Sequence, residues 1–428
     1  MPTVVFHTLG CRLNQAESAI IANDLKKKGY EVVDDANSAD LTVIHTCTVT
    51  EQADAKCRQA VRQSIRKNPG TFVAVIGCYA QMAIDTIRQI EGVDLIVGNE
   101  HKMHLSQFLD SLTKKNQPQV IHSKKISRQE FTIDFTAYDE SHTRANLKIQ
   151  DGCNFVCSFC IIASARGPAR SRKFNDIIRE TNKLVDMGYK EIVLTGVNVG
   201  TYQQDDHTFL DVLNELNKVN GIERIRISSI EPTTVTKEII DLMADSSKIC
   251  RHLHIPLQSG DDRILESMRR KHTAAFFKDI VEYAAEKIPD IGIGTDLMVG
   301  YPTEGDVEFK NTKKLLADLP VSYFHAFTYS DRKGTGSYNL KPKVDHHVKK
   351  ERNRIMIEMG ERKKLAFYDS FLGRSMNVLF EESHDGWWEG FSDNYMRVAV
   401  KSESDLKNEI KQVRLIEVKN QKILGEII

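Results

Sequence analysis

The sequence lacks several features that mark particular classes of protein. No apolar run reaches the roughly 18 residues of a membrane-spanning helix, and residues 1–14 contain no basic stretch followed by an apolar one. We therefore expect no membrane association and no secretory signal. The 59 Lys and Arg residues are balanced by 59 Asp and Glu residues, so no chain-wide field attracts nucleic acid. Any contact with RNA must come from local patches.

Cysteine is also scarce, with 8 among 428 residues. A disulfide framework needs a higher density of cysteine and an oxidising compartment. We therefore expect unpaired thiols in a reducing, cytoplasmic setting.

Three of the cysteines, Cys153, Cys157 and Cys160, form a Cys-x3-Cys-x2-Cys group. A 4Fe–4S cluster usually takes four thiolates from the protein, so three leave one iron open. That open position suits S-adenosylmethionine (SAM), which binds through its amino and carboxylate groups and receives an electron at its sulfonium. A closed zinc site prefers four ligands in paired cysteine halves, and the chain has no second Cys-x2-Cys pair. The spacing favours a SAM-binding cluster over zinc.

Residues 3–99 alternate between short apolar runs rich in β-branched residues and stretches of helix length. This alternation predicts an α/β domain with an open, doubly wound parallel sheet. The predicted strands are 4–8, 41–45, 72–76 and 94–97, and the predicted helices are 14–28 and 52–67.

Three further cysteines, Cys11, Cys47 and Cys78, each follow a predicted strand of this sheet. Because the carboxyl ends of parallel strands meet at one edge, where ligands bind, we expect the three thiols to lie together. The helix N-termini at that edge favour the negative charge of a thiolate-ligated cluster. Cys57 and Cys250 are assigned no role.

The alternation of strands and helices resumes at residue 145. It predicts a partial (βα)6 barrel with the Cys-x3-Cys-x2-Cys loop after its first strand, at the face where barrel active sites lie. The predicted strands are 145–150, 191–196, 224–229, 252–256, 292–299 and 323–329, with helices such as 175–187, 278–287 and 306–319. Short alternating segments at 376–380, 396–400 and 412–418 predict a small terminal β-barrel.

The predicted division of the chain has five parts. They are an N-terminal domain (1–116), a linker (117–144), the partial barrel (145–345), a helical bridge (346–369) and the small β-barrel (370–428).

Glycine and polar residues follow several of the barrel strands, where glycine lets a ligand approach the backbone. Hydroxyl, amide and carboxylate groups there suit the ribose and the amino acid part of SAM. The predicted cofactor-binding residues are Gly196, Asn198, Ser229, Glu231, Gln258, Asp296 and Gly300. No catalytic side chain is predicted.

Together these segments resemble the methylthiotransferase family of radical SAM enzymes over nearly the whole chain. The resemblance implies an N-terminal cluster-binding domain, a radical SAM barrel and a C-terminal barrel of the TRAM type. It is carried by residues 8–15, both cysteine groups, Arg166-Gly167, Ser171-Arg172, 254–260, 296–302, 327–330 and Gly334-Thr335. One departure is Ala163-Ser164, where the family usually has proline.

The resemblance also implies two 4Fe–4S clusters and SAM as cofactors. The cluster on Cys153, Cys157 and Cys160 would cleave SAM to a radical that takes hydrogen from C2 of an adenine. The cluster on the other three cysteines would donate sulfur carrying a methyl group. The motif Gly-Cys-Arg-Leu-Asn-Gln at 10–15 resembles the branch that modifies threonylcarbamoyladenosine next to the tRNA anticodon. The implied partners are a tRNA anticodon stem-loop, a low-potential electron donor of flavodoxin or ferredoxin type, and a sulfur source.

Other substrates remain open, namely isopentenyladenosine in tRNA or an aspartate of a ribosomal protein. A non-catalytic iron–sulfur or zinc RNA-binding protein is a further alternative. Because residues 368–428 carry 8 basic and 11 acidic side chains, the terminal barrel is expected to bind RNA by shape, a local patch or stacking on Trp387, Trp388 and Tyr395. Three basic groups could also contact RNA: Arg58, Arg62 and Arg66; Arg166, Arg170, Arg172 and Lys173; and Lys349, Lys350, Arg352, Arg354, Arg362, Lys363 and Lys364.

Overall fold

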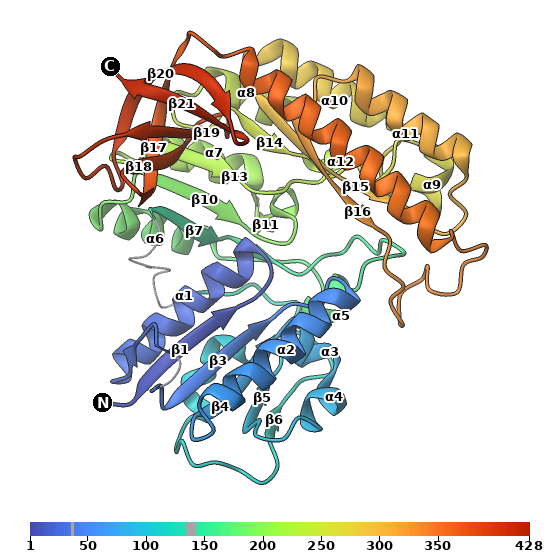
Figure 1. Cartoon of the computed structure of the whole chain (residues 1–428). Helices are drawn as coiled ribbons and strands as arrows, with labels where there is room; N and C mark the ends of the chain where they lie inside the picture. The colour runs from blue at the N-terminus through green and yellow to red at the C-terminus, as the bar shows by residue number, and fades with distance from the viewer. Residues whose placement is uncertain (36–37, 134–142) are drawn as a thin grey trace.

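The computed structural model describes residues 1–35, 38–133 and 143–428. They form three parts, an N-terminal α/β domain, a partial parallel barrel and a small closed β-barrel (Figure 1). The long helix α12 (His346–Asp369) packs on the last strand of the partial barrel and leads into the closed barrel. None of the helices in the described ranges is long and apolar enough to cross a membrane.

Six parallel strands form the N-terminal sheet, in the order β2-β1-β3-β4-β5-β6. The central strands β3 and β4 are buried along their whole length because helices cover both faces of the sheet. The predicted doubly wound parallel sheet is therefore confirmed. Its strands are β1 (Thr3–Thr8), β2 (Glu31–Val32), β3 (Leu41–Thr46), β4 (Phe72–Gly77), β5 (Leu95–Val97) and β6 (Gln119–Ile121). Its helical segments are α1 (Arg12–Lys27), α2 (Glu51–Lys67), α3 (Cys78–Met82), α4 (Ile84–Arg88) and η1 (Lys102–Phe108).

Two strands of this sheet were not predicted. β2 has 2 residues and β6 has 3, and such short runs show no periodicity that a sequence pattern could reveal. β6 pairs with β5, so the sheet extends into the predicted linker 117–144. Residues 134–142 of that linker lie outside the described residues.

The partial barrel consists of two parallel sheets, β13-β10-β7 and β14-β15-β16. Single parallel bridges, Ile225 to Ile249 and Ser229 to His254, join them into one curved wall, which confirms the expected order of six strands. The strands are β7 (Arg144–Lys148), β10 (Glu191–Thr195), β13 (Arg224–Ile227), β14 (His252–His254), β15 (Gly292–Val299) and β16 (Tyr323–Thr328).

The helices of the partial barrel cover the outside of its strands (Figure 1). Helix α10 starts at Ala274, earlier than predicted, because the Thr273 side chain accepts a hydrogen bond from the Phe276 amide and caps the helix. The helices are α5 (Ile162–Arg166), α6 (Phe174–Asp186), α7 (Phe209–Lys218), α8 (Lys237–Asp245), α9 (Asp262–Ser267), α10 (Ala274–Lys287) and α11 (Asp306–Asp318). Shorter elements are β8 (Gln150–Asp151), β9 (Arg170–Ser171), β11 (Gln203–Gln204), β12 (His207–Thr208), η2 (Val199–Thr201) and η3 (Pro232–Thr234).

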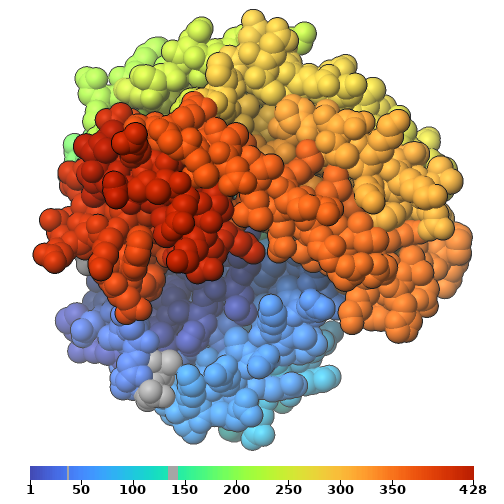
Figure 2. Space-filling view, turned by 45° about the horizontal axis from the view of Figure 1, so that its top comes forward, coloured from blue at the N-terminus to red at the C-terminus, as the bar shows by residue number. Residues whose placement is uncertain are grey.

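The C-terminal strands close into a barrel in the order β17-β18-β19-β21-β20, which confirms the predicted small β-barrel. On one face of the molecule it lies beside the N-terminal domain (Figure 2). Arg226 of the partial barrel donates to the carbonyl oxygens of Ser392 and Asp393, and so anchors the turn after β18. The strands are β17 (Ser375–His384), β18 (Trp387–Ser392), β19 (Arg397–Lys401), β20 (Ile410–Lys419) and β21 (Lys422–Ile427).

Candidate functional site

Cys11, Cys47 and Cys78 gather at the carboxyl edge of the N-terminal sheet. Cys11 caps α1, Cys47 follows β3 and Cys78 opens α3. Gly10 shows how tightly this edge is packed, because a β-carbon there would lie 2.7 Å from Cβ and 3.1 Å from Sγ of Cys47. Burial raises the pKa of Cys47 to about 11, and the charges of the Cys78 and Cys11 thiolates add to the rise. The structure therefore brings the three predicted ligands to one edge.

The second group, Cys153, Cys157 and Cys160, lies in the loop between β8 and α5. Burial raises the pKa of Cys153 to about 11 and that of Cys160 to about 12, and charge repulsion within the group adds to both. Such thiols are neutral until a metal displaces their protons. Burial also raises the pKa of Cys157, and a cation beside this thiol opposes the rise and so favours the thiolate form.

That cation is Arg270, which follows α9. The sequence patterns did not predict a role for it. Its Nη1 lies 3.5 Å from Sγ of Cys157. Nη1 also donates to Glu231, and Nη2 donates to Glu231 and, at 3.0 Å, to the carbonyl oxygen of Pro256. No sequence spacing links Arg270 to the cysteine loop, because their approach depends on the fold.

The cysteine groups differ from a site for a single ion. Among the described residues, no three His, Cys, Asp or Glu side chains converge closely enough to hold one metal ion. A 4Fe–4S cluster needs a wider arrangement, since each thiolate binds a different iron. Three thiols in each group, with a guanidinium beside one of them, suit clusters of this kind.

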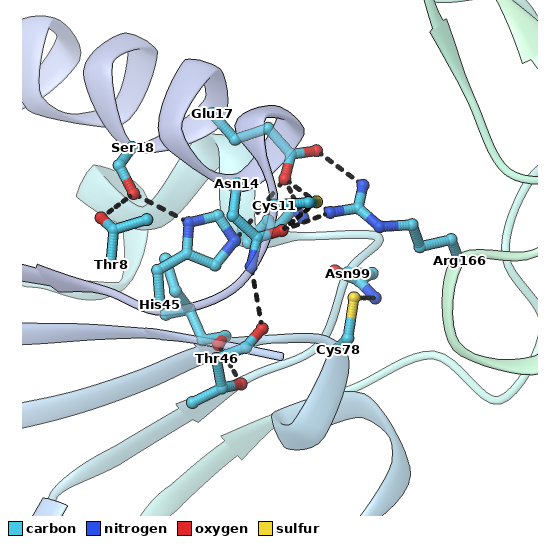
Figure 3. Close-up of polar contacts among 12 residues, drawn as sticks. Thr8, Cys11, Asn14, Glu17, Ser18, His45, Thr46, Cys78, Asn99 and Arg166 are labelled. Carbon is cyan, nitrogen blue, oxygen red and sulfur yellow. Dashed lines mark hydrogen bonds and ion pairs between the residues drawn. The ribbon is translucent and has the colours of Figure 1, made fainter. Parts of the chain in front are cut away.

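A fully buried ion network joins the N-terminal domain to α5, the helix that follows the second cysteine group, and Figure 3 shows its Glu17 and Arg166. Glu17 of α1 is its centre and lies 2.5 Å from Lys102, 2.7 Å from Lys148 and 3.0 Å from Arg166. Asp151 lies 2.8 Å from Lys148 and 2.9 Å from Arg166. Burial by itself raises the pKa of Glu17, but the three cations hold it well below its usual range. The network therefore joins the N-terminal domain to the partial barrel through full charges.

Asn14 connects this network to Cys11, and Asn99 connects Cys78 to helix α5 (Figure 3). Arg166 donates to Oδ1 of Asn14 at 2.6 Å, and that oxygen is 3.9 Å from Sγ of Cys11. Asn99 donates to a carbonyl oxygen of α5 at 2.6 Å, and its amide nitrogen is 3.6 Å from Sγ of Cys78. Helix α5, which follows the second cysteine group, also packs against α3. The two cysteine groups therefore lie at neighbouring helices of different domains.

Four of the predicted SAM-binding residues carry polar side chains within or just after strands of the partial barrel. Asn198 is 2% exposed, and neither atom of its side-chain amide has a hydrogen-bond partner among the described residues. Ser229 is 2.8 Å from Nδ1 of His254, whose other ring nitrogen is 3.3 Å from Asp296. Glu231 is paired with the Arg270 guanidinium. A buried amide without partners suits a polar ligand, because leaving it unpaired costs free energy.

Two of the other three predicted positions, Gly196 and Gly300, have a structural reason to be glycine. A β-carbon at Gly196 would lie 2.9 Å from Oε1 of Gln150, and one at Gly300 would meet the Lys349 side chain at 2.3 Å. Gln258 has φ of 71° and exchanges backbone hydrogen bonds with β15. The surrounding side chains therefore explain why glycine occupies positions 196 and 300.

Two cavities open beside these groups. One, of about 220 Å³, lies inside the partial barrel and is lined by Ser229, His254, Tyr323 and Tyr395 among others. A larger one, of about 560 Å³, lies where Cys11 faces β7, β10 and β17. Arg12 lines both cavities.

Several residues expected to contact RNA are committed elsewhere, and this prediction is wrong for them. Arg166 is 2% exposed in the ion network, and Arg172 is 1% exposed and paired with Asp176. Arg352 is buried against Glu304. These guanidiniums are paired with carboxylates inside the protein, which a count of basic residues along the chain does not reveal.

Comparison with known proteins agrees with this arrangement. Residues 147–316 match the Radical SAM superfamily, and residues 3–98 match a family described as uncharacterized protein family UPF0004. Threonylcarbamoyladenosine tRNA methylthiotransferase MtaB of Bacillus subtilis (strain 168) is 39% identical over 97% of this chain and 94% of its own length. A tRNA-2-methylthio-N(6)-dimethylallyladenosine synthase of Clostridium tetani is 32% identical over 89% of this chain and 85% of its own length.

Among solved structures, the radical SAM methyltransferase TsrM from Kitasatospora setae, with cobalamin and a [4Fe-4S] cluster bound, is similar in fold. The TM-score is 0.59 at 14% identity, over 79% of this chain and 77% of that chain. This similarity shows the fold alone.

The partial barrel, the cysteine loop near its first strand and the superfamily match define a radical SAM enzyme. The chain belongs to the methylthiotransferase family within that class, whose members are transferases that use SAM and 4Fe–4S clusters.

Proposed function

We propose that the substrate of this radical SAM tRNA methylthiotransferase is N6-threonylcarbamoyladenosine next to the anticodon, which receives a methylthio group at C2. The name of the relative that is 39% identical supports this substrate. The motif at residues 10–15 supports it independently. The relative that is 32% identical makes dimethylallyladenosine in tRNA the second candidate.

The observation that carries the methylthiotransferase chemistry of this proposal is the packing of α3 against α5. It brings Cys78, which opens α3, close to the loop of Cys153, Cys157 and Cys160, which precedes α5. We assign one 4Fe–4S cluster to that loop and a second to Cys11, Cys47 and Cys78. When bound, the two clusters and SAM would supply the electron, the radical and the sulfur of the reaction.

The chain's own residues would bind and orient these groups. Arg270 places a positive charge beside Cys157, where it would stabilise a thiolate. Asn198, Ser229 and Asp296 would provide polar contacts to SAM, and Asn198 has free donor and acceptor capacity for them. The ion network around Glu17 would hold the two domains in a fixed relation and exclude water from the region between the cysteine groups.

The same function needs a low-potential electron donor of flavodoxin or ferredoxin type and a sulfur source. We propose both as partners, together with the tRNA anticodon stem-loop. The cytoplasm is the proposed location, because the cluster thiols need a reducing compartment.

The direct test is mass spectrometry of tRNA nucleosides from a strain that lacks this gene. Loss of 2-methylthio-N6-threonylcarbamoyladenosine, restored by the wild-type gene and not by a gene encoding Cys153→Ala, is the expected result. Loss of the 2-methylthio form of dimethylallyladenosine (isopentenyladenosine) instead would support the second candidate. An unchanged nucleoside profile would contradict the assignment to tRNA.

A further inference from the structure

Arg12 is a cation in the site without a carboxylate partner among the described residues. It begins α1 directly after Cys11 and donates a hydrogen bond to the hydroxyl of Tyr395 in the C-terminal barrel. Its guanidinium carbon is 5.6 Å from the centre of the Tyr395 ring. Neighbouring guanidiniums are neutralised, since Arg144 pairs with Glu381 and Arg226 with Glu191.

The position of Arg12 is fixed by contacts between domains. The Tyr395 ring is 4.8 Å from the ring of Phe391 and 4.6 Å from that of His252. The Arg226 guanidinium carbon lies 5.1 Å from the same ring. Tyr395 is thus held between the C-terminal barrel and the partial barrel, and it holds Arg12 where its side chain lines the cavities.

Arg12 lines both cavities of the site, the inner one with Ser229 and His254 and the outer one with Cys11. The acidic side chains of the outer cavity, Glu381 and Glu382, have cationic partners of their own. Burial, together with a set of neighbouring charges that includes Arg12, holds the pKa of His252 well below its usual range, so this ring adds no competing positive charge. A negatively charged ligand in these cavities would find Arg12 unpaired.

We propose that the Arg12 guanidinium binds the carboxylate of the threonylcarbamoyl substituent and so determines which modified adenosine is accepted. This substituent ends in a carboxylate, whereas the dimethylallyl substituent is a hydrocarbon. A guanidinium forms a strong, charge-assisted hydrogen bond with a carboxylate. Facing a hydrocarbon, it would lose hydration without gaining a partner, so the site would reject the apolar substituent. The assignment rests on the proposed function and names the group that gives that function its specificity.

The test compares binding of two anticodon stem-loops to anaerobically reconstituted enzyme. One carries threonylcarbamoyladenosine and the other carries unmodified adenosine at the same position. We expect wild-type enzyme to prefer the modified stem-loop by roughly 10- to 100-fold, the range for a hydrogen bond to a charged group. Arg12→Gln should reduce this preference to near unity, and Arg12→Lys should restore part of it. Lys26→Gln, at the exposed end of the same helix, is the matched control and should keep the full preference.

Iron content and thermal midpoint, measured on each variant, show that a loss of preference does not arise from misfolding. SAM affinity is measured in parallel, because SAM also carries a carboxylate. An unchanged preference of Arg12→Gln between the stem-loops would overturn the assignment, whether or not its SAM affinity is weaker. If wild-type enzyme did not convert the threonylcarbamoyl stem-loop, the proposed function would fail as well. If it converts that stem-loop and Arg12→Gln still prefers it, only the role of Arg12 is wrong.

Discussion

Arg166 and Glu17 form a bidentate ion pair across the boundary between the N-terminal domain and the partial barrel. Nη1 of Arg166 is 3.0 Å from Oε1 of Glu17, and Nη2 is 3.0 Å from Oε2. Both side chains are buried. Because Arg166 closes α5, just after the cysteine loop, this pair connects the position of one cysteine group to that of the other.

Replacing Glu17 by Gln should destabilise the protein strongly. The change would remove the carboxylate partner of Lys102 and leave Lys148 and Arg166 with Asp151 in the network. Breaking a buried ion pair from one side costs about 3–5 kcal/mol, and we expect a loss of that size in urea unfolding of the cluster-free protein. Glu31→Gln, at an exposed position of the same domain, is the control. A loss below about 1 kcal/mol for Glu17→Gln would mean that the network is not essential to the fold.

Glu191 should make stability depend on acid pH. Burial raises the pKa of Glu191, but the charge and hydrogen bonds of Arg226 outweigh burial and lower it to about 2 from an ordinary 4.5. A lowered pKa stabilises the folded state above pH 4.5, and this contribution is lost as the pH falls toward 2.

The measurement is the difference in unfolding free energy between wild type and Glu191→Gln as a function of pH. We expect the difference to be constant above pH 5 and to shrink by about 3 kcal/mol on acidification. A difference that does not vary with pH would show that folding leaves the pKa of Glu191 unchanged.

The two cysteine groups should have separable roles. Wild-type protein reconstituted without oxygen should hold about eight irons, and each triple cysteine-to-alanine variant about four. Loss of Cys11, Cys47 and Cys78 should prevent sulfur insertion and still allow 5′-deoxyadenosine to form from SAM. Loss of Cys153, Cys157 and Cys160 should abolish both.

Cys250→Ala is the control for these variants, since Cys250 is buried and assigned to neither group. If the first triple variant were folded and yet formed no 5′-deoxyadenosine, the division of roles would be wrong.

Arg270 should tune the cluster on the second cysteine group. A positive charge 3.5 Å from a ligand sulfur favours the reduced, more negative cluster. Arg270→Gln should therefore shift the reduction potential to more negative values, by roughly 60 mV for a tenfold effect on the equilibrium. Arg270→Lys keeps the charge and should shift it less. An EPR-monitored redox titration checks both, and equal potentials in all three proteins would contradict this role.

Much of the fold was predictable from the chain alone. Strands β3, β4 and β15 form from runs rich in β-branched residues, and they are largely buried. Because such a run can be recognised from neighbouring residues alone, the positions of these strands along the chain were predictable. β2 and β6 could not be found this way, because two or three residues become a strand only when an existing sheet edge pairs with them. Their formation depends on contacts with distant residues.

The candidate site likewise has residues that the sequence identifies and residues that only the tertiary structure reveals. The sequence alone identified the six cysteines as candidate cluster ligands. Three follow predicted strands and three have the Cys-x3-Cys-x2-Cys spacing, and both patterns can be recognised from neighbouring residues. Only the tertiary structure decided that Arg270 lies beside Cys157, that Arg166 is a buried partner of Glu17, and that Tyr395 holds Arg12 at the cavities. The partners in these contacts are more than 100 residues apart in the chain. A charge is compensated, exposed or aimed at a ligand according to its neighbours in space, and those neighbours are set by folding.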